Sequence, residues 1–189
     1  MSNVFFISDT HFSHDAVIKF DRSDGTKVRP NFDSIEAMDE LMVEKWNSTV
    51  KPEDKVYHLG DVVMKKRFID IVKRLNGRKR LIMGNHDIFG FRFYADYFSE
   101  VYAMRILHGE GIMMSHIPLH LDSIKRGCVN VHGHIHERII AHDTQMVLGK
   151  IEDQHPKYFN VCVEHHNYTP IPMEVIQERI RALPSYHDV

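Results

Sequence analysis

The sequence feature that most constrains the fold is a repeated pattern in which a short apolar run ends directly in a reactive polar group. Three such runs are predicted as strands: residues 4–8 before Asp9, residues 55–59 before Gly60-Asp61, and residues 80–83 before Gly84-Asn85-His86-Asp87. Runs of this kind are typical of buried strands that present polar residues at their carboxyl ends. The pattern predicts an α/β sheet with a ligand site at that edge.

Helical spacing of apolar residues lies between and after these strands. Residues 34–47 predict a helix with Ser34 as its N-cap, residues 67–75 predict a shorter one, and residues 172–181 predict a closing helix with proline in its first turn. The second half also contains four short runs typical of strands: residues 100–106, 111–115, 129–131 and 159–163. We therefore expect a second sheet, and one domain over residues 1–189.

Composition limits the classes of protein that this chain can represent. Its 189 residues are 43% hydrophobic and 26% charged, with a net charge of -2, which fits a globular protein and supplies no overall basic field for nucleic acid. The two cysteines are too few for a disulfide framework, and the first residues form neither a basic leader nor a membrane span. These features predict a cytoplasmic protein with no membrane partner.

The polar motifs have the residue types and the spacing of a metal site. Side chains at i and i+2 of an extended segment point the same way, so Asp9 can act with His11, and His134 with His136. Carboxylates and imidazoles suit borderline divalent ions such as manganese, iron, zinc and nickel. A shared aspartate can bridge two such ions roughly 3.5–4 Å apart, and such a pair generates hydroxide at neutral pH.

Five motifs in a fixed order resemble the calcineurin-like metallophosphoesterase superfamily. They are Asp9-x-His11, Gly60-Asp61, Gly84-Asn85-His86-Asp87, the lone His116, and Gly133-His134-x-His136. The resemblance covers residues 9–136 and is closest to the small bacterial and phage members. It implies an α/β fold, a four-layer α/β/β/α sandwich of two mixed sheets flanked by helices.

The resemblance also implies a role for each motif residue. The expected ligands are Asp9, His11 and His136 for a first metal ion, Asn85, His116 and His134 for a second, and Asp61 as the bridge between both. His86 is implied to be catalytic, because it would protonate the leaving oxygen or stabilise its developing charge. Manganese is the expected ion for both positions, with iron, zinc, nickel or magnesium as alternatives.

The implied activity is hydrolysis of a small-molecule phosphoester by a hydroxide held between two divalent metal ions. Protein Ser/Thr phosphatases of this superfamily carry an aspartate and an arginine shortly after the Gly-Asp pair, where this chain has Met64 and Lys65. The difference favours a phosphodiester, such as a small cyclic or linear nucleotide, over a phosphoprotein. A phosphomonoesterase and a metal-free binding scaffold of the same fold remain the alternatives.

Some residues near the motifs allow two interpretations. His14 is as compatible with contacting substrate as with a surface position at a helix start, and the polar loop 19–34 either covers the site or is plain surface. For Asn160 we favour a hydrogen-bonded strand end over a place in the metal site. Asp87 either hydrogen-bonds within its loop or orients His86.

Other candidates are best explained as ordinary structure. His58 is predicted to be a satisfied core histidine, and Cys128 and Cys162 to be small buried hydrophobes. One basic run could bind a nucleic-acid backbone, but helical spacing disperses its charges and favours a solvated face. Its members are Lys65, Lys66, Arg67, Lys73, Arg74, Arg78, Lys79 and Arg80.

Overall fold

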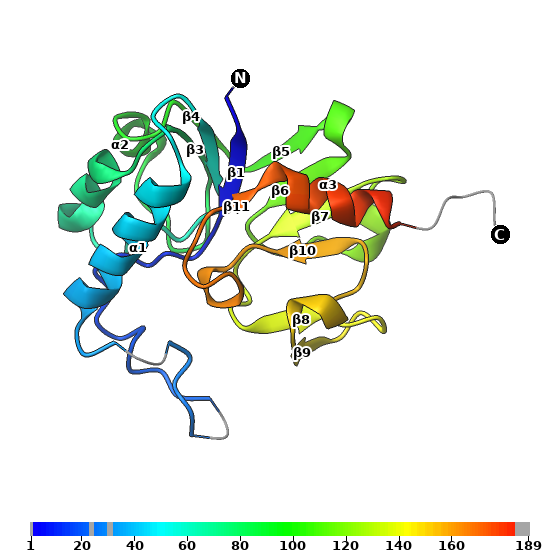
Figure 1. The fold of residues 1–189 in the computed structure, drawn as a ribbon, viewed down its shortest axis with the longest axis horizontal. Helices are drawn as coiled ribbons and strands as arrows, with labels where there is room; N and C mark the ends of the chain where they lie inside the picture. The colour runs from blue at the N-terminus through cyan, green and yellow to red at the C-terminus, as the bar shows by residue number, and fades with distance from the viewer. Residues whose placement is uncertain (1, 23–24, 30–31, 184–189) are drawn as a thin grey trace.

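The computed structural model describes residues 2–22, 25–29 and 32–183, and contains two mixed sheets flanked by helices (Figure 1). The first sheet has the order β11-β1-β2-β3-β4, formed by β1 Val4–Ile7, β2 Lys55–His58, β3 Arg78–Ile82, β4 Glu100–Tyr102 and β11 Ile171–Pro172. The second has the order β10-β7-β6-β5, formed by β5 Met104–Leu107, β6 Ile112–Ser115, β7 Val129–His132 and β10 Tyr158–Asn160. The predicted fold class is confirmed.

Each sheet combines parallel strands with one antiparallel edge strand. Strands β1 to β4 run parallel and β11 is antiparallel to β1, while β10, β7 and β6 run parallel and β5 is antiparallel to β6. Parallel strands end at one edge of their sheet. The residues that follow β1, β2 and β3, and those that follow β6, β7 and β10, are therefore placed to form a common site.

Apolar core residues lie both between the two sheets and between the first sheet and its helices, because side chains alternate along each strand. In β1, Phe6 points toward the second sheet, whereas its neighbours Phe5 and Ile7 point toward the helices. In β6, Met114 belongs to the core between the sheets and Met113 faces outward. Both faces of each sheet are covered, which explains the nearly continuous apolar character of these strands.

Helices cover the outer face of the first sheet. Helix α1, Ile35–Thr49, begins where the hydroxyl of Ser34 accepts a hydrogen bond from the Ala37 N–H, as its predicted N-cap role requires. A 3-10 helix, Lys66–Arg74, and the short helix α2, Phe91–Ala95, lie on the same side. The closing helix α3, Met173–Arg181, packs Ile176 into the core between the sheets.

Several predicted boundaries need correction. The run 100–106 contains two strands of different sheets, β4 and β5, because the chain crosses from one sheet to the other at residue 103. The run 159–163 stops being a strand at Asn160, and a 3-10 turn starts at Val163. The hairpin of β8, Arg138–Ile140, and β9, Met146–Leu148, was not predicted. Within the described residues, no helix has the length and apolar character needed to cross a membrane.

Candidate metal centre

The motif residues lie in tight turns at the carboxyl ends of the strands. Five of them adopt left-handed backbone conformations, with φ values of 59° at Asp9, 47° at His11, 57° at Asp61, 72° at His134 and 49° at His136. Aspartate and histidine enter this region more readily than most residues, but it remains costly for any side chain larger than glycine. The strain is concentrated where the chain must present several side chains to one point.

Two motif glycines permit a close approach of neighbouring loops. A Cβ atom on Gly84 would collide with the carboxylate of Asp61, and one on Gly133 would collide with the side chains of Ser8 and Asp9. Gly60 combines a φ of 100° with a position where a Cβ would lie 2.6 Å from the Cα of Gly84. These glycines therefore bring the metal-ligand candidates together rather than serve only as flexible turns.

A first cluster consists of Asp9, His11 and His136, whose ligand-type atoms lie within 4.8 Å of one another. Asp9 Oδ1 lies 3.7 Å from His11 Nε2 and 3.9 Å from His136 Nε2. The other carboxylate oxygen, Oδ2, accepts hydrogen bonds from the backbone N–H of His134 at 2.8 Å and from the thiol of Cys162 at 3.2 Å. One oxygen is thus fixed by the protein while the other faces the cluster.

A second cluster consists of Asp61, His116 and His134, again within 4.8 Å. The Nδ1 atom of His116 lies 2.7 Å from the carbonyl of Leu59, so that Nε2 faces Asp61 Oδ2 at 3.5 Å. The same Nε2 lies 2.9 Å from the side-chain oxygen of Asn85. The structure therefore places Asn85 beside the second cluster.

The carboxylate of Asp61 lies between the clusters. Its Oδ2 atom is 3.7 Å from His11 Nε2 and 3.5 Å from His116 Nε2, while Oδ1 accepts the backbone N–H of His86 at 2.9 Å. The side chain is only 2% exposed. One oxygen atom within reach of both clusters has the geometry required of a bridging ligand.

The buried atoms of the first cluster fit a cation. Asp9 Oδ1 and both ring nitrogens of His11 are buried and make no hydrogen bond with any described residue. Leaving such groups unpaired costs free energy, which a metal ion coordinated by them would recover. Carboxylate and imidazole together form the donor set of borderline divalent ions.

The electrostatics of both clusters favour positive charge. Burial alone would lower the pKa of His116, but the carboxylates of Asp61 and Asp9 outweigh it and raise that pKa to about 9. For His136, burial is likewise outweighed, in this case by Glu164 and Asp9, and its pKa also rises to about 9. Both positions attract a cation, whether a proton or a metal ion.

A buried ion pair that the sequence analysis did not identify supports the first cluster. Glu164 Oε1 lies 2.9 Å from His136 Nδ1 and accepts a hydrogen bond from Arg29 Nε at 2.8 Å. Arg29 is 1% exposed and also donates to the backbone carbonyls of Asp9 and Thr10. Burial would raise the pKa of Glu164, but Arg29 and His136 lower it to about 2.

Asp87 connects the loops that carry the second cluster. Its carboxylate accepts the backbone N–H groups of Asp61 at 2.8 Å, Gly84 at 2.8 Å and Val62 at 3.2 Å. Of the two roles considered for Asp87, the structure supports hydrogen bonding within and between loops. His86 is positioned through its own backbone N–H and Asp61.

The two histidines expected near the substrate lie at the opening of the centre. The ring of His86 is 44% exposed, with Nε2 3.9 Å from Asp61 Oδ2 and its centroid 5.7 Å from that of His11. The ring of His14 is also 5.7 Å from His11. Burial, followed by electrostatic interaction with the rings of His11 and His86, lowers the pKa of His14 from its ordinary value of about 6.5, which favours the neutral ring at pH 7.

The predicted structural roles of three other residues are confirmed. His58 is buried, hydrogen-bonded to Thr10 and stacked on Trp46. Asn160 donates to the carbonyls of His136 and Arg138 at 2.9 Å, as a hydrogen-bonded strand-end residue. Cys162 is buried, and in addition its thiol contacts Asp9.

The described part of loop 19–34 borders the centre instead of being plain surface. Phe20, Asp21 and Arg22 line a hollow beside His134 and His136, and the buried Arg29 contacts Glu164 and the backbone of Asp9. Three cations of the basic run are paired with carboxylates, which supports the solvated-face interpretation. The pairs are Lys73–Asp70, Arg74–Glu40 and Arg80–Glu100.

Comparison with known proteins shows the family of this chain. The family model of the calcineurin-like phosphoesterase superfamily domain matches residues 3–160. The uncharacterized protein MJ1445 of Methanocaldococcus jannaschii is 30% identical over 95% of this chain and 92% of its own length. The Gene 66 protein of Mycobacterium phage D29 is 32% identical over 74% of this chain and 81% of its own length.

A solved structure shares the fold. The protein AQ665 from Aquifex aeolicus, described as of unknown function, superposes with a TM-score of 0.67 and 26% identity over 94% of this chain and 99% of its own. Two mixed sheets that carry carboxylate–imidazole clusters at the carboxyl ends of their parallel strands define an α/β protein of the phosphoesterase type. The chain belongs to the calcineurin-like phosphoesterase superfamily.

Proposed function

We propose that this protein is a phosphoester hydrolase that uses two divalent metal ions, with manganese as the expected ion, and acts on phosphodiesters such as small cyclic or linear nucleotides. The observation that carries the proposal is the position of Asp61 Oδ2, 3.7 Å from His11 Nε2 and 3.5 Å from His116 Nε2. Family membership supports the reaction class. We further propose that residues 1–189 act as one catalytic domain, since both sheets contribute to the centre.

The proposed ligands follow the two clusters. Asp9, His11 and His136 would hold the first ion, Asn85, His116 and His134 the second, and Asp61 both. When bound, the two ions supply positive charge for the phosphoryl oxygens and an activated water. Lys65, which stands where protein phosphatases carry an arginine, supports a diester over a phosphoprotein.

The residues of the chain itself provide position and proton transfer. Asp61 holds the loop of His86 through the His86 N–H, and Asp87 ties that loop to the end of β2. The half-exposed ring of His86 is thereby kept at the opening, where it would donate a proton to the departing alkoxide. His14 stands beside His11 as a neutral hydrogen-bonding partner for substrate.

A paired hydrolysis assay tests the proposal. A chromogenic phosphodiester and the matching monoester are offered to the wild type and to Asp61→Ala with manganese, nickel, zinc or magnesium. We expect metal-dependent hydrolysis that favours the diester and is lost in Asp61→Ala. Undiminished activity of Asp61→Ala would overturn the mechanism, and a preference for the monoester would overturn the substrate class.

A further inference from the structure

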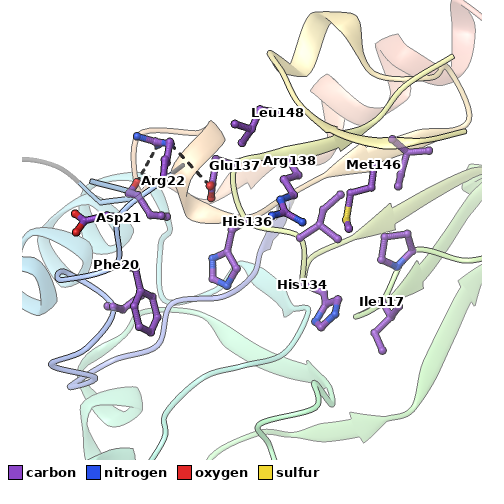
Figure 2. A pocket seen from close by; sticks show the side chains of 15 residues that line it. Phe20, Asp21, Arg22, Ile117, His134, His136, Glu137, Arg138, Met146 and Leu148 are labelled. Carbon is purple, nitrogen blue, oxygen red and sulfur yellow. Dashed lines mark hydrogen bonds and ion pairs between the residues drawn. The ribbon is translucent and has the colours of Figure 1, made fainter. Parts of the chain in front are cut away.

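A hollow of about 680 Å³ opens beside His134 and His136 (Figure 2). Its walls come from the segment after β1, from the turn after β6, and from the β8–β9 hairpin. The volume lies within the range of roughly 300–1,000 Å³ found for small-molecule sites. The hollow touches one residue of each cluster, so a molecule bound at the clusters can extend into it.

The hollow gathers exposed apolar side chains. Among the described residues, nine large hydrophobic side chains are exposed, and four of these line the hollow. They are Phe20 at 50%, Ile117 at 53%, Met146 at 48% and Leu148 at 51% exposure. Apolar side chains collected around a polar centre indicate a ligand with apolar surface of its own.

Among the charged side chains that line the hollow, one cation has no carboxylate partner within the described residues. Arg22 lies 3.8 Å from Glu137, and Asp21 lies 2.8 Å from Lys27. Arg138 directs its guanidinium group into the hollow and makes no ion pair with any residue that the structure describes (Figure 2). A planar guanidinium stacks on aromatic faces and attracts negative charge.

Phe20 connects the hollow to the clusters. Its ring packs edge-on against His14 with centroids 6.0 Å apart, and the His14 ring lies 5.7 Å from that of His11. An aromatic surface therefore continues from the first cluster into the hollow. A phosphoryl group at the clusters and a ring attached to it would meet complementary surfaces at the same time.

We propose that this hollow is a subsite for a planar aromatic ring carried by the substrate, between a phenyl group and a nucleobase in size. The proposal rests on the proposed function, because the ring must be attached to a phosphorus group held at the clusters. It sets the substrate class more narrowly: the protein prefers phosphoesters with an aromatic arm over those with only small alkyl arms.

Two non-hydrolysable probes test the subsite without any turnover. Titration calorimetry of the manganese-loaded protein compares phenylphosphonate with methylphosphonate. We expect phenylphosphonate to bind about tenfold more tightly, since its ring would bury apolar surface in the hollow. Equal affinities, or failure of both probes to bind, would overturn the subsite, whereas the proposed function is overturned only by the hydrolysis assay described above.

Variants of strand β9 test whether the preference for phenylphosphonate arises from the hollow. Met146→Ser and Leu148→Ser remove lining side chains that are half exposed, and Val147→Ser is the matched control. Val147 lies between them and points to the opposite face of the hairpin. We expect both lining variants to lose most of the preference for phenylphosphonate and the control to keep it, with methylphosphonate affinity unchanged in all three. A preference that persists in both lining variants would overturn the subsite.

Discussion

The two clusters differ in what holds them in place. The first is supported by side-chain charge from outside the motifs, since Glu164 contacts His136 and the buried Arg29 contacts both Glu164 and the backbone of Asp9. The second is supported by the motif loops and the residue next to them, through the Leu59 carbonyl behind His116 and the carboxylate of Asp87. One half of the centre therefore depends on a buried ion pair from outside the motifs, and the other half on hydrogen bonds between the motif loops themselves.

This difference predicts that the halves respond to different substitutions. A change in Asp61, the proposed bridge, should abolish the function of both clusters. Changes in the buried ion pair should weaken the first cluster alone, and changes at the opening should affect turnover without weakening either cluster. Four experiments separate these cases, beginning with the largest expected effect.

Asp61→Ala removes the atom that the clusters share. We expect kcat/KM to fall by about 10³-fold or more, because the variant loses the charge between both sets of ligands. Manganese titration by calorimetry should show that both binding events are weakened. If only one event were weakened, Asp61 would belong to a single cluster and the bridging role would be wrong.

His86→Gln tests the residue at the opening. We expect kcat to fall by about 10²- to 10⁴-fold, the usual contribution of a general acid, while both manganese binding events stay as in the wild type. A substrate whose leaving group needs no proton should lose much less activity. An equal loss for good and poor leaving groups would argue against proton donation by His86.

Glu164→Gln and Arg29→Met separate the two clusters. Each should weaken the first manganese binding event by about 10- to 100-fold, as expected for a partner behind a ligand, and leave the second unchanged. Arg29→Met should also lower the free energy of unfolding by about 3–5 kcal/mol, because it removes Arg29, the stronger of the two positively charged partners of the buried Glu164 carboxylate.

Arg22→Met is the matched control for Arg29→Met. Arg22 lies in the same loop and has its own ion pair with Glu137, with a 23% exposed side chain. Manganese binding and unfolding should change little in this variant, because a partly exposed pair is worth about 0–1 kcal/mol. A similar loss of manganese affinity in both variants would attribute the effect to the loop rather than to the buried pair.

The pH dependence of stability and of manganese affinity is the smallest of the expected effects. The pKa values of His116 and His136 are raised to about 9, so their protonation stabilises the metal-free protein fully below about pH 6.5, and this stability is lost as the pH rises through 9. Over the same window manganese affinity should increase, since the ion displaces these protons. The measurements are thermal unfolding of chelated protein and calorimetry in buffers of different ionisation enthalpy.

Glu164→Gln should remove about half of the pH dependence of stability and of manganese affinity. It removes the carboxylate that raises the pKa of His136, while His116 keeps Asp61. The number of protons released on saturation with manganese near pH 8 should therefore fall by about one. An unchanged proton count would show that Glu164 does not control His136.

The sequence by itself determined the parts of this protein that depend on local pattern. Apolar runs that end in Gly-Asp or Gly-Asn-His-Asp placed the strands and their polar ends, and the order of five motifs indicated the family and both clusters. Strand limits near residues 103 and 160 were wrong because alternation of apolar residues does not reveal where a chain changes sheets. The β8–β9 hairpin was missed for a similar reason, since β9 is exposed throughout.

Only the tertiary structure shows which residues support the motif side chains and which residues line the hollow next to them. Arg29 is an isolated arginine in a polar loop, and Glu164 lies 135 residues further along the chain, so no local signal links them. Their pairing exists because two loops fold over the same strand end, where a buried charge must find a partner. The hollow also forms from three segments distant in sequence, and its apolar lining emerges only when they meet.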